Sequence, residues 1–155
     1  MQPIDVGSLA PDFSLADPSG QPISLSGLYG APVVLAFYPG DWSPVCSDQL
    51  ELYSKLLPDF ERYGAAILAI SVDSQWCHGA FGEARHLRFP LLADFEPKGA
   101  VAQMYGVYRK RDGTAERALF VIDEQGTIVW KHTCELNVNP GADGILSALE
   151  RLTSN

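Results

Sequence analysis

Long apolar runs and basic residues are both scarce in this chain of 155 residues. Its longest apolar stretches, such as residues 33–38, fall far short of the ~20 residues that a membrane-spanning helix needs. Lys and Arg number 11 against 19 Asp and Glu, which gives a formal net charge of −8. Nucleic-acid backbones are bound by clustered cations, and the nearest such cluster, residues 109–111, precedes Asp112 and Gly113 and is typical of a solvated turn. We therefore expect neither a membrane nor a nucleic acid as a partner.

Cysteine is also rare, with three residues and no Cys-x-x-Cys pair. Residues 1–5 lack a basic start and no apolar run follows them, so a secretory signal peptide is not indicated and we expect a cytoplasmic protein. In a reducing compartment, three cysteines do not indicate a structural disulfide framework. Cys77 and His78 are adjacent, which is poor spacing for chelation, so we expect no metal site and no cofactor.

The composition, 46% hydrophobic and 19% charged, is that of a globular protein, and we expect residues 1–155 to form one domain. Two short apolar runs, residues 33–38 and 66–72, predict buried strands. Between them, apolar residues at three- and four-residue spacing predict a helix over 44–63, capped by Gly64. Strand, helix and strand in this order predict a parallel βαβ unit.

The rest of the chain predicts three more helices and a hairpin. The helices are expected at residues 76–87, with Ser74 as N-cap, at 97–105 and at 141–152. The hairpin joins residues 119–122 to 127–130 through a turn that contains Gly126. Together these elements predict an α/β fold, a thioredoxin-like three-layer sandwich whose central mixed sheet carries helices on both faces.

Cys46 lies at the turn between the first of these strands and the helix that follows it. Reactive groups in open α/β sheets gather at the carboxyl ends of strands. The first turn of a helix also offers unpaired N–H groups and the positive end of the helix dipole, which favour the nucleophilic thiolate. This placement alone is equally compatible with an inert buried cysteine.

The neighbours of Cys46 favour the reactive interpretation. Residues 39–46, Pro-Gly-Asp-Trp-Ser-Pro-Val-Cys, closely resemble the peroxiredoxin active-site motif Pro-x-x-x-Thr/Ser-x-x-Cys. Further segments resemble that family in the same order along nearly the whole chain, namely residues 7–13, 71–81, 89–94 and 117–123. The resemblance implies a thiol peroxidase that reduces hydrogen peroxide and organic hydroperoxides through a sulfenic acid at Cys46.

The resemblance also implies roles for three neighbours of Cys46. The transition state carries negative charge on sulfur and both oxygens, so fixed donors lower the barrier. Ser43 and the Cys46 N–H are expected as donors, and Arg117 as a permanent cation with a planar fork that holds the thiolate. Pro39, which lacks an N–H, is expected to shield the thiolate from water.

Two positions depart from the family pattern. Trp42 stands where a smaller aromatic is usual, and Gln49 stands where many members carry Glu. We expect neither departure to touch a residue that catalysis needs.

A second thiol could condense with the sulfenic acid to give a disulfide, provided that the two Cα atoms come within ~7 Å. Cys77 follows a strand parallel to the one that leads to Cys46, and Cys134 follows the strand antiparallel to the one that Arg117 begins. We rank Cys77 before Cys134 as resolving cysteine, and a mechanism without an internal resolver stays open. The family's C-terminal resolving cysteine has no counterpart.

The partners follow from the same resemblance: a hydroperoxide substrate and a thioredoxin-like or other thiol reductant. We also expect a homodimer, formed through the aromatics Trp42, Trp76 and Phe81 near the reactive edge. A thiol–disulfide oxidoreductase of the same fold is disfavoured because Gln49 stands where its second cysteine would be. A redox sensor that uses Cys46 is the other alternative.

Overall fold

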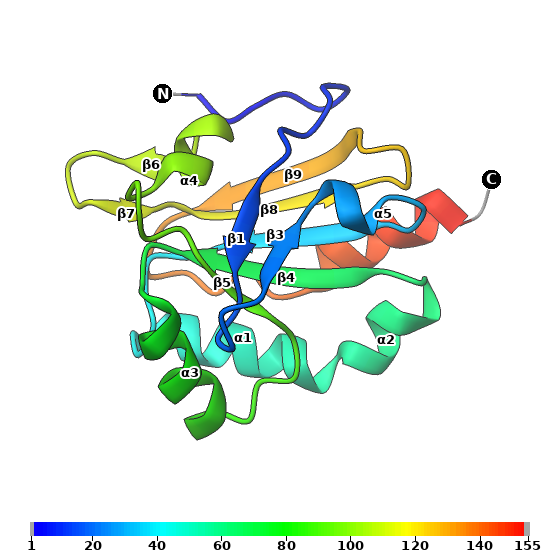
Figure 1. Cartoon of the computed structure of the whole chain (residues 1–155). Coiled ribbons are helices and arrows are strands. Elements are labelled where there is room, and N and C mark those ends of the chain that lie inside the picture. Colours follow the sequence, from blue (N-terminus) through cyan, green and yellow to red (C-terminus); the bar gives the residue numbers. More distant parts are fainter. Residues whose placement is uncertain (1, 154–155) are drawn as a thin grey trace.

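The computed structural model describes residues 2–153 and is built on a mixed seven-stranded sheet (Figure 1). The strand order is β2-β1-β5-β4-β3-β8-β9, and a separate two-stranded sheet pairs β6 with β7. The strands are β1 Ser14–Ala16, β2 Pro22–Ser24, β3 Val33–Phe37, β4 Ala66–Ser71, β5 Leu91–Ala93, β6 Tyr108–Arg109, β7 Thr114–Ala115, β8 Arg117–Ile122 and β9 Ile128–Cys134. The helices are the 3-10 helix η1 Ser26–Leu28, α1 Pro44–Lys55, α2 Leu57–Arg62, α3 Gln75–Ala84, α4 Ala100–Met104 and α5 Asp143–Thr153.

The centre of the sheet is the expected βαβ unit. β3 pairs parallel with β4 over five residues, from Val33 opposite Ala66 to Phe37 opposite Ile70. On its other side β3 pairs antiparallel with β8, and β8 with β9. All five residues of β3 are buried, which is why this strand is a continuous apolar run in the sequence.

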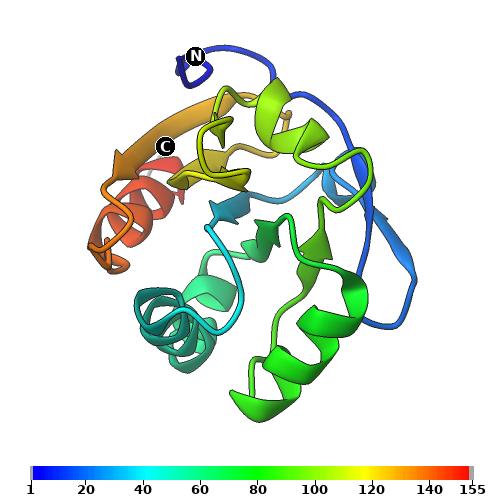
Figure 2. The same ribbon diagram turned by 90° about the vertical axis from the view of Figure 1, so that its left-hand side faces the viewer.

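Helices cover both faces of the sheet, as expected, but unequally (Figure 2). One face packs on α1, α2, α3 and α5 through a core that includes Leu50, Phe60, Phe81 and Leu149. The other face is covered by α4 and by the N-terminal segment through residues such as Phe13 and Tyr105. No helix in residues 2–153 is long and apolar enough to cross a membrane.

The helix expected over 44–63 is broken in two. α1 ends at Lys55 and α2 begins at Leu57. Pro58 has no N–H to donate to the Ser54 carbonyl, and its ring would clash with that carbonyl in a continuous helix. The Ser54 carbonyl instead accepts from Arg88 Nη2 at 3.3 Å.

Three further strands escaped the sequence patterns. β5 is three residues long, and β6 and β7 are two residues each, too short to show a period. Helix α4 is shorter than the expected 97–105, because it starts after Gly99, whose φ of 69° is left-handed.

Candidate active site

Cys46 is the third residue of α1, at the edge of the sheet where β3 and β4 end. Because β8 runs antiparallel to β3 and Phe37 faces Ala118, the first residue of β8, Arg117, lies at the same edge. Cys134, the last residue of β9, pairs directly with Arg117. Residues that are far apart in the sequence therefore meet around Cys46.

Arg117 contacts the sulfur of Cys46 inside the protein. Its Nη1 lies 3.2 Å from Cys46 Sγ, and the two residues are 2% and 0% exposed. The guanidinium is oriented by the carbonyl oxygen of Leu136, which accepts from Nε at 3.1 Å and from Nη2 at 2.6 Å. The planar fork is thereby fixed with one nitrogen aimed at the sulfur.

The charge of Arg117 has few compensating groups. Within residues 2–153, its hydrogen bonds run to the Leu136 carbonyl, the Gln49 amide and the Cys46 sulfur, and none of these acceptors is a carboxylate. A buried cation without a counter-charge is costly. Arg117 therefore presents a positive charge to the Cys46 sulfur at 3.2 Å with no carboxylate beside it in the described part of the chain.

Gln49 corrects our expectation that the departures from the family pattern touch nothing that catalysis needs. This side chain is fully buried, and its Oε1 accepts from Arg117 Nη1 at 2.7 Å. Its Nε2 donates to Tyr53 Oη at 3.0 Å, and Tyr53 in turn donates to the Gly141 carbonyl at 2.8 Å. The contact crosses 68 residues of sequence, so no local pattern could reveal it.

The hydroxyl of Ser43 is available for a ligand. Ser43 is the N-cap residue of α1, but its Oγ makes no capping hydrogen bond. This oxygen is buried and finds no hydrogen-bond partner among the described residues. Buried polar atoms are nearly always paired, so an unpaired hydroxyl three residues before Cys46 points to a group that arrives with the substrate.

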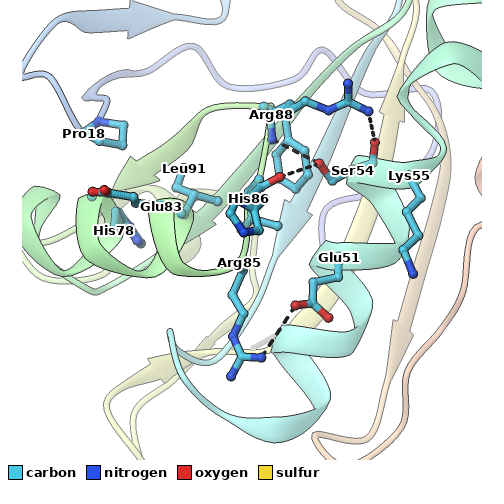
Figure 3. A pocket seen from close by; sticks show the side chains of 14 residues that line it. Pro18, Glu51, Ser54, Lys55, His78, Glu83, Arg85, His86, Arg88 and Leu91 are labelled. Carbon is cyan, nitrogen blue, oxygen red and sulfur yellow. Dashed lines mark hydrogen bonds and ion pairs between the residues drawn. The ribbon is translucent and has the colours of Figure 1, made fainter.

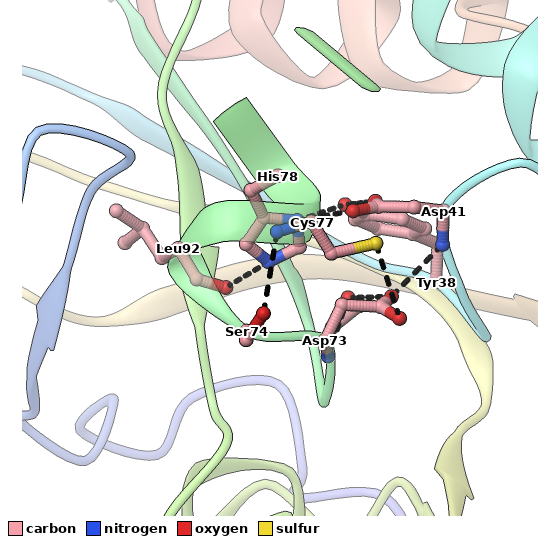
Figure 4. Close-up of polar contacts among 8 residues, drawn as sticks. Tyr38, Asp41, Asp73, Ser74, Cys77, His78 and Leu92 are labelled. Atoms are coloured by element: carbon pink, nitrogen blue, oxygen red, sulfur yellow. Dashed lines mark hydrogen bonds and ion pairs between the residues drawn. The ribbon is translucent and has the colours of Figure 1, made fainter. Parts of the chain in front are cut away.

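The loop that carries Ser43, residues 39–43, is tied to α3 by buried polar contacts (Figure 4). Asp41 accepts from Tyr38 Oη at 2.6 Å and lies 2.7 Å from His78 Nδ1. The backbone N–H of Asp41 donates to Asp73 at 2.8 Å. His78, whose position next to Cys77 is poor spacing for chelation, therefore belongs to the surroundings of the site.

Cys77 occupies the third position of α3, as Cys46 does in α1. Ser74 caps this helix by accepting from the Cys77 N–H at 3.2 Å, as expected. Burial, together with the negative charges of Asp41 and Asp73, raises the pKa of the Cys77 thiol to about 11. In this conformation the Cys77 thiol is therefore a weak nucleophile.

Among the described residues, Asp41, Asp73 and Cys77 form the group whose ligand atoms could hold a metal, because these atoms lie within 4.8 Å of one another. Both carboxylates already accept hydrogen bonds, Asp41 from Tyr38 and Asp73 from Ser71 Oγ at 2.6 Å. A cation here would have to displace these donors.

A family model described as AhpC/TSA family matches residues 6–131. The chain belongs to the AhpC/TSA family. Alkyl hydroperoxide reductase E of Mycobacterium tuberculosis is 41% identical over 126 residues, which cover 81% of this chain and 82% of the relative. Peroxiredoxin-2 of Mus musculus is 35% identical over 155 residues, which cover 94% of this chain and 77% of the relative.

Solved structures agree with this membership. The crystal structure of peroxidoxin BcpB from Mycobacterium tuberculosis matches with a TM-score of 0.85 and 31% identity, covering 95% of this chain and 97% of that one. The reduced 2-Cys peroxiredoxin of Plasmodium vivax matches with a TM-score of 0.86 and 26% identity, covering 96% and 81%. The expected peroxiredoxin family, thioredoxin-like fold and thiol peroxidase function are confirmed.

Cys134 is the second candidate resolver in this AhpC/TSA-family protein. It lies opposite Arg117 in the sheet, so both side chains project from the same face. Its Sγ donates to the Val138 carbonyl at 3.4 Å, and burial raises the pKa of its thiol. Strand β9, which carries Cys134, lies on the other side of β8 from β3, the strand that leads to Cys46.

The aromatics expected at a dimer contact differ in exposure. Trp42 and Trp76 are 48% and 76% exposed. Phe81 is fully buried, against our expectation, because α3 turns it into the core, where it packs edge-to-face on Trp42 with ring centroids 5.2 Å apart. A partner could therefore contact the two tryptophans but not Phe81.

A separate groove of about 880 Å³ lies between α1 and α3 (Figure 3). Glu51 and Arg85 face each other across it at 3.6 Å, and Ser54 Oγ donates to the His86 carbonyl at 3.3 Å. The described residues that line it do not include Cys46, Ser43 or Arg117. The volume of this groove therefore gives no guide to where the peroxide reacts.

Proposed function

We propose that Cys46 is the residue with which this thiol peroxidase attacks hydroperoxides. The observation that carries the proposal is the buried contact of 3.2 Å between Arg117 Nη1 and Cys46 Sγ. The thiolate attacks one peroxide oxygen and the O–O bond breaks. Cys46 becomes a sulfenic acid, and the departing alkoxide or hydroxide takes up a proton to give an alcohol or water.

The proposed roles of the neighbours follow from where the charge develops. Arg117 stabilises the thiolate and the oxygen atoms in the transition state. Ser43, whose buried hydroxyl has no partner among residues 2–153, donates to a peroxide oxygen. Pro39 lies at the start of the loop and limits the approach of water to the sulfur.

Access to Cys46 requires motion. The residue has 0% exposed surface, so a hydroperoxide reaches it only after the surrounding chain shifts. Such local opening is inexpensive at the ends of helices and in loops. We therefore propose that opening of this edge accompanies each catalytic cycle.

Recycling needs a thiol reductant, and we propose a thioredoxin-like protein in a cytoplasmic setting. If Cys77 is the resolver, its thiol condenses with the sulfenic acid of Cys46 and releases water. The raised pKa of the Cys77 thiol supports a mechanism in which the first turns of α1 and α3 unwind before the bridge forms. We further propose that the protein, a single domain over residues 1–155, forms a homodimer through the exposed Trp42 and Trp76.

Mass spectrometry after one equivalent of hydrogen peroxide tests the assignment. The wild type and the variants Cys46→Ser, Cys77→Ser and Cys134→Ser are compared. We expect Cys46→Ser to consume peroxide only at the background rate and the other two to complete the first turnover. A bridged peptide identifies the resolver, and persistent sulfenic acid indicates a one-cysteine mechanism. Normal turnover by Cys46→Ser would contradict the proposal.

A further inference from the structure

The side chain and the backbone N–H of Asp41 anchor the loop 39–43 (Figure 4). Its two carboxylate oxygens contact Tyr38 Oη at 2.6 Å and His78 Nδ1 at 2.7 Å. The side chains of Asp41 and His78 are both 0% exposed. Burying a carboxylate costs free energy, and hydrogen bonds offset this cost only when their partners are held in the right geometry.

Both ring nitrogens of His78 have partners. Nε2 lies 3.1 Å from the carbonyl oxygen of Leu92, which can only accept, so Nε2 donates. Nδ1 lies 2.7 Å from an oxygen of Asp41 and 3.3 Å from Tyr38 Oη. The ring therefore bridges two elements, the loop 39–43 on one side and β5 on the other.

We propose that His78 and Asp41 are positioning residues, which hold the loop 39–43 in the conformation that presents Ser43 to the peroxide. This inference rests on the proposed function of Cys46 and Ser43. Within residues 2–153, neither His78 nor Asp41 forms a hydrogen bond with the Cys46 sulfur, so the pair acts through the loop backbone and leaves the contact between Arg117 and Cys46 unchanged.

The backbone of the loop shows why it needs such an anchor. Trp42 has a φ of 71°, a left-handed conformation that a bulky side chain adopts only when its surroundings impose it. Asp41 precedes Trp42, and Ser43 follows it and begins α1. Fixing Asp41 by its side chain and by its N–H to Asp73 therefore fixes the strained turn and the direction of the Ser43 hydroxyl.

Two substitutions of His78 separate its contacts. In His78→Asn the amide nitrogen takes the place of Nδ1 and keeps the donor to Asp41. In His78→Gln it takes the place of Nε2 and keeps the donor to Leu92. We expect His78→Gln to slow the reaction of Cys46 with hydrogen peroxide by at least about tenfold, and His78→Asn to stay close to the wild type.

The pH profile distinguishes positioning from a loss of thiolate. The rate of His78→Gln should be lower even where Cys46 is fully ionised, with the ionisation midpoint unmoved. Amide hydrogen exchange over residues 40–47 should be faster in His78→Gln than in His78→Asn, whether or not the protein turns over peroxide. Exchange therefore tests the anchor even if the proposed function of Cys46 fails.

Equal rates and equal exchange in the two variants would overturn the inference. If His78→Gln does not fold, Tyr38→Phe carries the same test, because it removes the hydroxyl that Tyr38 offers to Asp41 and, at 3.3 Å, to His78 Nδ1, while the contact between Asp41 and His78 remains. We expect Tyr38→Phe to show the same kinetic pattern with a smaller loss. Wild-type rate and wild-type exchange in Tyr38→Phe would then overturn the inference.

Discussion

The turns Ser43–Cys46 and Ser74–Cys77 occupy equivalent places in the fold but surround their sulfur atoms with opposite charges. Each begins with the N-cap serine of a helix and places cysteine at the third helical position. Each follows a strand of the same parallel pair, β3 and β4. The sulfur of Cys46 meets the guanidinium of Arg117 at 3.2 Å, whereas that of Cys77 lies 4.0 Å from a carboxylate oxygen of Asp73.

This contrast shows how little a helix N-terminus contributes by itself. Both thiols have the same relation to a helix dipole, which is worth only about 0.3–1 kcal/mol at an exposed site. Burial and the neighbouring carboxylates nevertheless raise the pKa of the Cys77 thiol to about 11. The surroundings of each sulfur, rather than its place on a helix, therefore distinguish the two cysteines.

Removing the guanidinium of Arg117 should have the largest effect on the difference in reactivity between Cys46 and Cys77. Arg117→Ala is expected to slow the reaction of Cys46 with hydrogen peroxide by at least about tenfold, since a tenfold change corresponds to only about 1.4 kcal/mol. Ionisation of Cys46, followed by thiolate absorbance, should move to higher pH. Arg109→Ala is the matched control, because Arg109 pairs with Asp112 and Glu116 away from Cys46. An unchanged thiol titration would remove Arg117 from its proposed role.

The two N-cap serines, Ser43 and Ser74, should respond differently to replacement by alanine. Ser74→Ala removes the acceptor of the Cys77 N–H and should lower the free energy of unfolding by about 1 kcal/mol. Ser43→Ala removes a hydroxyl without a partner in residues 2–153, so the free energy of unfolding should change by less than about 0.5 kcal/mol. Urea denaturation of the two variants measures the difference. Equal losses would mean that Ser43 caps α1 in solution.

Removing the negative charge of Asp73 beside Cys77 should have the smallest effect on the difference in reactivity between the two cysteines. In Asp73→Asn, made in a Cys46→Ser background, alkylation of Cys77 at about pH 8 should become about threefold faster, because a larger share of the thiol is ionised. At a pKa of about 11, only about one molecule in a thousand carries the Cys77 thiolate at that pH. Cys134 in the same sample is the internal control. The same alkylation rate in both proteins would show that burial and Asp41 suppress Cys77 without a contribution from Asp73.

The sequence predicted the helices and strands whose apolar residues follow a regular pattern. It also predicted the residues that the active-site motif brings together. The strands at 33–38 and 66–72, the hairpin and the cap at Ser74 are present because each is encoded within a few neighbouring residues. The expected convergence of Cys46 and Arg117 also holds in the structure. It depends on strand order and direction, which the βαβ pattern and the hairpin already imply.

The contacts that the sequence left open depend on how side chains pack over long separations. The bond between Arg117 and Gln49 crosses 68 residues, and that between Asp41 and His78 crosses 37. Neither follows from a local pattern, since each requires the register of the sheet and the path of a loop. The break at Leu56 differs, because Pro58 was visible in the sequence and its steric effect could have been read there.

The acceptor that orients Arg117 is a main-chain atom, the carbonyl oxygen of Leu136, and Tyr53 likewise donates to the main chain at Gly141. A side-chain replacement cannot delete either oxygen. The segment 135–141 can therefore drift in sequence over evolution while the guanidinium stays aimed at the sulfur. A deletion or insertion of one residue in that segment would displace the carbonyl and release the guanidinium. The site is thus robust to substitution in this segment, apart from Gly141 with its left-handed φ of 67°, and fragile to a change in the length of the segment.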